Sequence, residues 1–125
     1  MDENEISHAI IGAAIEVHRT LGPGLLESIY ESALSFELRN KGFEVHQQQE
    51  LPVVYKGVEL GGNFRIDLLI SDLVIVEVKA VERLLPVHEA QVLTYLKLSG
   101  KKLGLVLNFN STAISSSVRR VVNNF

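Results

Sequence analysis

Apolar residues recur at helical spacing in the first third of the chain. Over residues 5–20 they fall three and four positions apart, which predicts an amphipathic helix. Residues 2–4 offer side chains that cap a helix start, and Gly22-Pro23-Gly24 breaks the pattern. A second apolar stripe predicts another helix from about residue 25 to residue 40, which Gly42 terminates.

The next part of the chain alternates between apolar and polar residues, as β-strands do. The strands expected here cover residues 43–51, 53–60, 64–70 and 73–79. The first should end at Pro52, and the second contains a candidate turn at Lys56-Gly57. Gly61-Gly62 is a further turn signal, so these segments predict four successive strands.

A third helix is expected over about residues 87–99, after Pro86 and before Gly100. The apolar run 103–109 is typical of a buried strand, expected to lie parallel to a neighbour across that helix. For the tail from residue 111 two alternatives stay open, a short helix or an edge strand.

This order, α-α-β-β-β-β-α-β with a short tail, predicts an α/β fold in which helices flank a mixed central β-sheet. With 125 residues the chain is the size of one domain, so we assign residues 1–125 to a single domain. A chain of this length can bury a core without disulfides or structural metals.

Composition and charge narrow the functional classes. The chain has no cysteine, which excludes disulfides, thiol nucleophiles and cysteine zinc sites. Its first residues are acidic where a secretory signal is basic, and its apolar runs are too short to span a bilayer. We therefore expect a soluble, cytoplasmic protein with no membrane partner. The net charge of −3 argues against coating nucleic acid by bulk electrostatics, but not against an enzyme that uses metal ions.

Candidate chemistry lies on the two most strongly patterned strands, which carry Asp67, Glu77 and Lys79. Alternation places Glu77 and Lys79 on one face. A two-residue turn at Ser71-Asp72 would put Asp67 and Glu77 on opposite faces, whereas a three-residue loop at 71–73 or a bulge pairs them. The second register is favoured because it places four apolar side chains together on one face, namely Ile66, Leu68, Val76 and Val78.

Two adjacent carboxylates repel each other, so this pairing requires a positive partner. Lys79 is one candidate, and a divalent cation is the other, because carboxylate oxygens suit Mg²⁺ or Mn²⁺. The Val78 carbonyl is a further candidate ligand. Such a set suits phosphodiester hydrolysis, in which Lys79 orients the attacking water. A purely structural lysine-bridged acidic pair remains equally open from the spacing alone.

The pattern Asp67…Glu77-Val78-Lys79 resembles the signature of the PD-(D/E)xK nuclease superfamily. Gly24-Leu25-Leu26-Glu27-Ser28-Ile29-Tyr30 matches the motif that names the GxxExxY protein family. Further segments that resemble this family are residues 17–24, Gln91-x-x-x-Tyr95-Leu96-Lys97 and Leu107-Asn108-Phe109. The resemblance implies a restriction-endonuclease-like core close to RecB-type exonucleases.

By this resemblance, Asp67 and Glu77 hold Mg²⁺ or Mn²⁺, and Lys79 is the catalytic lysine. Glu27 completes the metal shell directly or through water, although a carboxylate favoured by the helix N-terminus is the alternative reading. Gln91 and Tyr95, four apart on one helical face, lie near the substrate.

These expectations add up to a metal-dependent nuclease acting on nucleic acid, DNA rather than RNA. One alternative is a nuclease-fold module that binds nucleic acid or a partner without cleavage, and another is a structural protein. A homodimer or a protein partner would enlarge the small binding surface. His88 is expected at a helix start rather than on phosphate, and the remaining histidines form no spaced ligand pair, so zinc is not expected.

Overall fold

The computed structural model describes residues 1–124, leaving aside the side chains of residues 62 and 63. The helices are α1 (Glu3–Leu21), α2 (Glu27–Asn40) and α3 (Pro86–Ser99), with a 3-10 turn η1 (Ile114–Ser116). The strands are β1 (Val45–Tyr55), β2 (Val58–Ile70), β3 (Val74–Lys79), β4 (Leu103–Asn108) and β5 (Val118–Val122).

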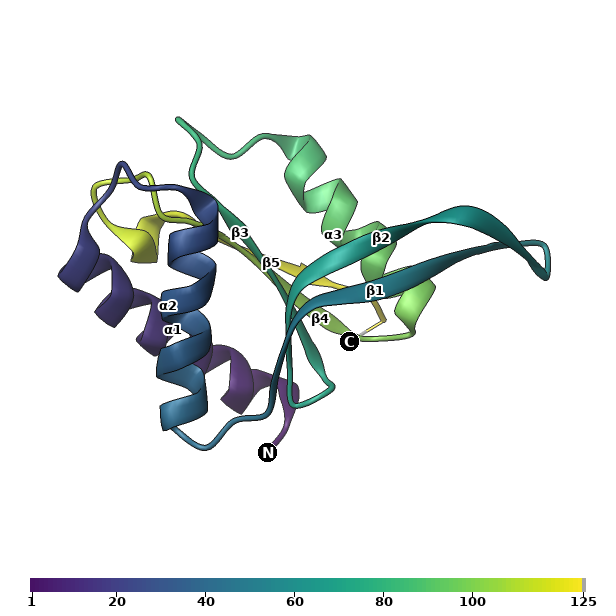
Figure 1. Ribbon diagram of the computed structural model, residues 1–125, viewed down its shortest axis with the longest axis horizontal. Helices are drawn as coiled ribbons and strands as arrows, with labels where there is room; N and C mark the ends of the chain where they lie inside the picture. The colour runs from purple at the N-terminus through teal and green to yellow at the C-terminus, as the bar shows by residue number, and fades with distance from the viewer. Residues whose placement is uncertain (125) are drawn as a thin grey trace.

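The strands form one mixed sheet in the order β1-β2-β3-β4-β5. Strand β4 lies parallel to β3 across α3, and the other neighbours are antiparallel. Helices α1 and α2 cover one face of this sheet, and α3 covers the other (Figure 1). The α/β class, the mixed sheet with flanking helices and the parallel strand after the third helix are thus confirmed.

Each face of the sheet has its own apolar core. The larger core lies under α1 and α2, and its sheet residues include Val45, Leu68, Ile70, Val74, Val76, Val78, Leu105 and Leu107. The smaller core lies under α3 and consists of Leu51, Ile66, Leu69, Ile75, Val92, Tyr95, Leu96, Val106 and Val121. A Cβ at Gly104 would come within 2.5 Å of Val92 Cγ1, so glycine at this position lets α3 lie close on the sheet.

Residues 43–70 form two strands instead of the three that were expected, which corrects the predicted element order. Strand β1 continues through Pro52, because β1 is an edge strand where a missing N–H is tolerated. Gly61-Gly62 is not a turn, because the pairing steps from Pro52↔Asn63 to Val53↔Leu60 and leaves the two glycines as a bulge. The hairpin turn is Lys56-Gly57, as expected, with φ of 49° and 78°.

The β1–β2 hairpin extends past the rest of the sheet as a two-stranded arm (Figure 1). Strand β2 pairs with β3 only over Leu68–Ile70, and its earlier residues pair with β1 alone. The two strands therefore diverge immediately before Leu68, at the position of Asp67.

The tail contains both a short helical turn and an edge strand, because η1 is followed by β5. The observed order of helices and strands is therefore α-α-β-β-β-α-β-β, with η1 before the last strand. Phe125 lies outside the described residues. No helix within residues 1–124 is long and apolar enough to cross a membrane.

Candidate active site

Asp67 and Glu77 lie opposite each other where β2 and β3 diverge. The last ladder pair before this point is Leu68↔Val76, which sets Asp67 against Glu77 in the next position. Residues 71–73 join the two strands, and Ser71 and Asp72 both adopt left-handed φ values, 54° and 56°. The register favoured from the hydrophobic pattern is therefore confirmed.

The two carboxylates replace the backbone ladder at this divergence. Glu77 Oε1 accepts the Asp67 backbone N–H at 3.2 Å. Asp67 Oδ2 accepts the Val78 backbone N–H at 2.8 Å. Each side chain is thus held by the opposite strand, which fixes both carboxylates at one point of the sheet.

Electrostatics at this point favour a proton or a cation. Burial, followed by the negative charge of Asp67, raises the pKa of Glu77 to about 8. The Asp67 backbone N–H and the Lys79 ammonium oppose that rise. Glu77 is only 4% exposed, so the pair can relieve its repulsion only by taking up positive charge.

Glu27 reaches this region from α2. It is the first residue of α2, and its Oε2 accepts the Ala80 backbone N–H at 3.0 Å, directly after Lys79. Burial, and then the negative charges of Asp67 and Glu27, raises the pKa of Glu31, which hydrogen bonds from Gln47 and Gln48 lower. Both readings of Glu27 are therefore compatible with its position at a helix start beside β3.

The Gly-x-x-Glu-x-x-Tyr pattern is explained by the loop before α2. The Tyr30 hydroxyl donates to the Gly22 carbonyl at 2.6 Å and accepts the Leu25 N–H at 3.0 Å. Gly24 has φ +98°, a conformation that glycine adopts without strain. Tyr30 thus holds the loop that leads into Glu27.

The Leu-Asn-Phe segment at the end of β4 supports the same unit. The Phe109 ring stacks on Tyr30 with centroids 4.7 Å apart. Buried Asn108 accepts the Val81 N–H at 3.1 Å and donates to the Val81 carbonyl at 2.9 Å. These contacts fasten the chain that follows Lys79 to the end of β4.

Helix α3 contributes Gln91 and Tyr95 from the opposite face of the sheet. Burial, then the charges of Glu77 and Asp67, raises the pKa of the Tyr95 phenol, and its hydrogen bond with Gln91 opposes this. The charges of both carboxylates thus act on the Tyr95 phenol, and the expected place of Tyr95 near the substrate stays a prediction. Tyr95 is buried in the smaller core.

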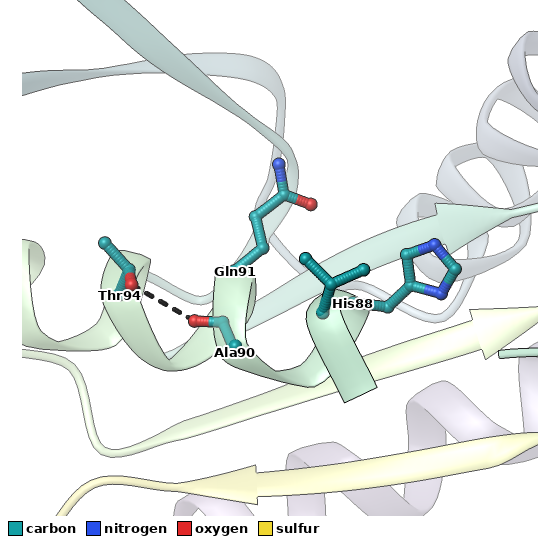
Figure 2. A pocket seen from close by; sticks show the side chains of 5 residues that line it. His88, Ala90, Gln91 and Thr94 are labelled. Carbon is teal, nitrogen blue, oxygen red and sulfur yellow. Dashed lines mark hydrogen bonds between the residues drawn. The ribbon is translucent and has the colours of Figure 1, made fainter. Parts of the chain in front are cut away.

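An open groove of about 430 Å³ runs along the start of α3 and is lined by Val87, His88, Ala90, Gln91 and Thr94 (Figure 2). His88 Nδ1 accepts the Leu85 N–H at 3.0 Å, so this imidazole caps the helix start, as expected.

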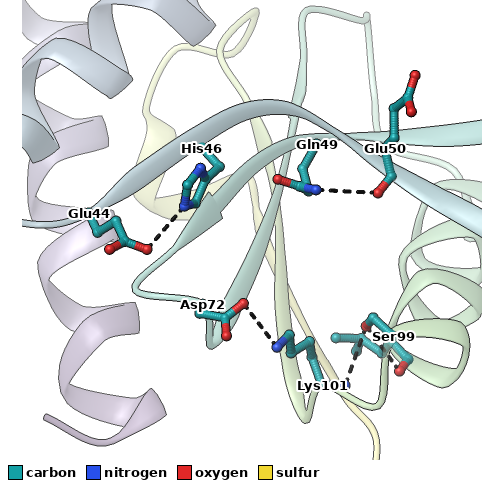
Figure 3. Close-up of polar contacts among 8 residues, drawn as sticks. Glu44, His46, Gln49, Glu50, Asp72, Ser99 and Lys101 are labelled. Carbon is teal, nitrogen blue, oxygen red and sulfur yellow. Dashed lines mark hydrogen bonds and ion pairs between the residues drawn. The ribbon is translucent and has the colours of Figure 1, made fainter.

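A second groove, of about 290 Å³, lies at the other end of the sheet. His46, Gln49, Asp72, Ser99 and Lys101 contribute to it (Figure 3). Lys101 pairs with Asp72 at 3.1 Å beside the starts of β3 and β4, whereas Lys79 ends β3. This groove is therefore separate from the candidate site.

Ile66 departs from the predicted apolar side. Leu68, Val76 and Val78 lie in the larger core, but Ile66 lies in the smaller core on the opposite face. The alternation is interrupted where Gln48, with φ 52°, stands opposite Asp67. A regular strand pattern contains no sign of this interruption.

Sequence reasoning missed three polar residues beside the pair, namely Glu31, Gln47 and Gln48. Gln48 Nε2 donates to Glu31 Oε1 at 2.8 Å and to Asp67 Oδ1 at 3.3 Å. Gln47 Nε2 donates to Glu31 Oε2 at 3.3 Å. Glu31 lies four residues after Glu27, and this helical spacing was the one available signal.

The donors present suit a hard divalent cation, because they are carboxylates that already require positive charge. Among the side chains that the structure describes, however, no three Asp, Glu or His residues are arranged to hold a metal ion. Oxygens of Asp67 and Glu27 are instead bonded to backbone amides. The predicted ligand set of Glu27, Asp67, Glu77 and the Val78 carbonyl therefore stays a prediction.

A family model described as the PD-(D/E)XK nuclease superfamily matches residues 4–121. No curated protein and no solved structure matches the chain.

Proposed function

Because this chain belongs to the PD-(D/E)XK nuclease superfamily, we propose that it hydrolyses phosphodiester bonds of nucleic acid, DNA rather than RNA. Nucleases of this superfamily generally use divalent metal ions. The closer relation to GxxExxY proteins and RecB-type exonucleases belongs to the same proposal. The absence of cysteine fits a reducing compartment, so we place the reaction in the cytoplasm.

The observation that carries this proposal is the pairing of Asp67 and Glu77 where β2 and β3 diverge, with Lys79 next on the same face. Asp67, Glu77 and Glu27, with the Val78 carbonyl, would hold Mg²⁺ or Mn²⁺. A bound divalent cation polarises a phosphoryl oxygen and acidifies a water.

The protein's own groups have distinct parts in this reaction. The Lys79 ammonium orients the attacking water and stabilises the negative charge that develops on the phosphate. Its charge already acts on this point, since it counters the raised pKa of Glu77. Gln91 lines the α3 groove, and Tyr95 hydrogen-bonds to it from the smaller core, so that the two would position the substrate strand.

Cleavage of single- and double-stranded DNA and RNA in Mg²⁺ and in Mn²⁺ tests this function. We expect cleavage by the wild type, and a loss of about 100-fold or more for Lys79→Ala and Asp67→Asn. Lys102→Ala is the matched control, because Lys102 is exposed beside the start of β4. Absence of wild-type cleavage in both metals contradicts the proposal.

A second candidate is a nuclease-fold module that binds nucleic acid or a protein without cleaving it. The bonds from backbone amides to Asp67 and Glu27 favour it, because they engage oxygens that a metal would need. Exposed apolar residues on the arm, Val54, Tyr55, Val58 and Leu60, offer a surface for a protein partner or a second copy. Binding that survives Lys79→Ala, without wild-type cleavage, identifies this alternative.

A further inference from the structure

Gln48 combines a strained backbone with a bridging side chain. Its φ of 52° lies in the left-handed region, which non-glycine residues adopt at a cost. The residue stands within β1, between the ladder pairs Gln47↔Leu68 and Gln49↔Ile66, and directly opposite Asp67. Its side chain is exposed, so burial of apolar surface does not compensate for the strain.

The strain changes where the side chains of β1 point. Neighbouring residues of a regular strand face opposite sides of the sheet. Gln47 and Gln48 are neighbours, yet both donate to the Glu31 carboxylate on α2. Beyond them Leu51 lies in the smaller core, although Val45, an even number of residues earlier, lies in the larger core. The side chains of β1 therefore change faces at Gln48, the left-handed residue.

The result of this turn is a bridge from α2 to Asp67. A glutamine amide has two N–H groups. The Gln48 amide donates to Glu31 Oε1 at 2.8 Å and to Asp67 Oδ1 at 3.3 Å. The other Asp67 oxygen accepts the Val78 N–H at 2.8 Å. Both oxygens of Asp67 are therefore held, one by β3 and one through Gln48.

We propose that Gln48 is a positioning residue, which uses its strained backbone to place the amide that orients Asp67 toward the cation. The proposal rests on the proposed metal-dependent function. Groups that bond to a metal-binding carboxylate typically change metal affinity by about 10–100-fold when they are removed. Glu31 anchors the amide at its other end.

Gln48→Gly separates the two properties of this residue. Glycine adopts φ 52° without strain and has no amide side chain. Without metal, we expect Gln48→Gly to melt above Gln48→Ala, which lacks the same amide but keeps a Cβ in the left-handed region. We expect Mn²⁺ affinity, measured by calorimetry, to fall about tenfold or more. Equal melting temperatures in Gln48→Gly and Gln48→Ala would show that the backbone at this position is not strained.

Gln49→Gly is the matched control, because Gln49 is the exposed neighbour and, among the described residues, its amide donates to the Glu50 carbonyl alone, at 3.5 Å. Its Mn²⁺ affinity should stay within about twofold of the wild type, since it lies outside the bridge. Gln48→Asn is a second variant, since asparagine tolerates the left-handed region but is too short to bridge both carboxylates. It should also bind Mn²⁺ more weakly than the wild type.

The outcomes are distinct. Wild-type binding of Mn²⁺ with unchanged affinity in Gln48→Gly and Gln48→Asn overturns the positioning role and leaves the proposed metal site intact. A melting temperature of Gln48→Gly without metal that is no higher than that of Gln48→Ala overturns the strain argument. Absence of Mn²⁺ binding by the wild type overturns the metal site, and the positioning role with it.

Discussion

The Glu77 carboxylate accepts the backbone N–H of Asp67 at 3.2 Å, across the divergence between β2 and β3. This contact joins the buried Glu77 side chain of β3 to β2, the strand that carries Asp67. Because the ladder ends here, side-chain oxygens take the place of backbone carbonyls, and two carboxyl groups share one poorly solvated point. The consequences for pH, metal and stability follow from that relationship.

Without metal, the stability of the protein should fall as pH rises from about 4.5 to about 8. The folded state keeps a proton on Glu77, whose pKa is raised from 4.5 to about 8, while the unfolded chain releases it. Glu77→Gln removes this loss, on the order of a few kcal/mol at pH 8. Urea unfolding in EDTA at pH 5, 7 and 8 measures it.

Glu59→Gln is the control for this titration, because Glu59 is an exposed glutamate on β2, the strand next to β3. It should retain the wild-type decline in stability with pH. An equally steep decline in Glu77→Gln would show that Glu77 is not the group responsible.

Tyr30→Phe should destabilise the protein by about 1–3 kcal/mol, because the Gly22 carbonyl and the Leu25 N–H both lose their partner. The stack on Phe109 is kept, so the variant isolates the hydroxyl. Urea unfolding gives the change in free energy of unfolding. Exposed Tyr55→Phe should be neutral, and equal losses in the two variants would contradict the anchoring of this loop.

Gly104→Ala should destabilise by about 1–3 kcal/mol, because its Cβ would lie 2.5 Å from Val92 Cγ1 on α3. Adding Val92→Ala removes the clashing methyl, so the double variant should lose less than the sum of the two single changes. Gly12→Ala in α1 is the opposite control, since nothing lies within 4 Å and alanine favours a helix. Additive losses at residues 104 and 92 would contradict the close packing of α3.

The sequence was sufficient for the main architecture and for the register of the acidic pair. Apolar alternation distinguishes the two registers of Asp67 and Glu77, because a shift of one residue would turn every apolar side chain to the other face. Helix ends were equally predictable, since Gly100 and the Gly22–Gly24 segment act locally. These features depend on neighbouring residues alone.

Features that depend on tertiary context were not predictable. Pro52 and Gly61-Gly62 resemble breaks, and only the edge position of β1 and the bulge in β2 explain why the strands continue through them. Glutamine is not a residue type that signals a left-handed backbone, so nothing in the sequence indicated the conformation of Gln48 or its bridge to Asp67. The burial of Tyr95 likewise follows from the packing of α3 on the arm, where its ring lies 5.5 Å from Phe64.

Thermal melting in increasing Mn²⁺ tests most directly whether Asp67 and Glu77 form one cation site. A ligand that binds only the folded state stabilises it by about 2.7 kcal/mol at one hundred times its Kd. The account predicts a melting temperature that rises with Mn²⁺ in the wild type and in Glu59→Gln, but not in Asp67→Asn or Glu77→Gln. A wild-type melting temperature that does not respond to Mn²⁺, or an equal rise in all four proteins, would contradict it.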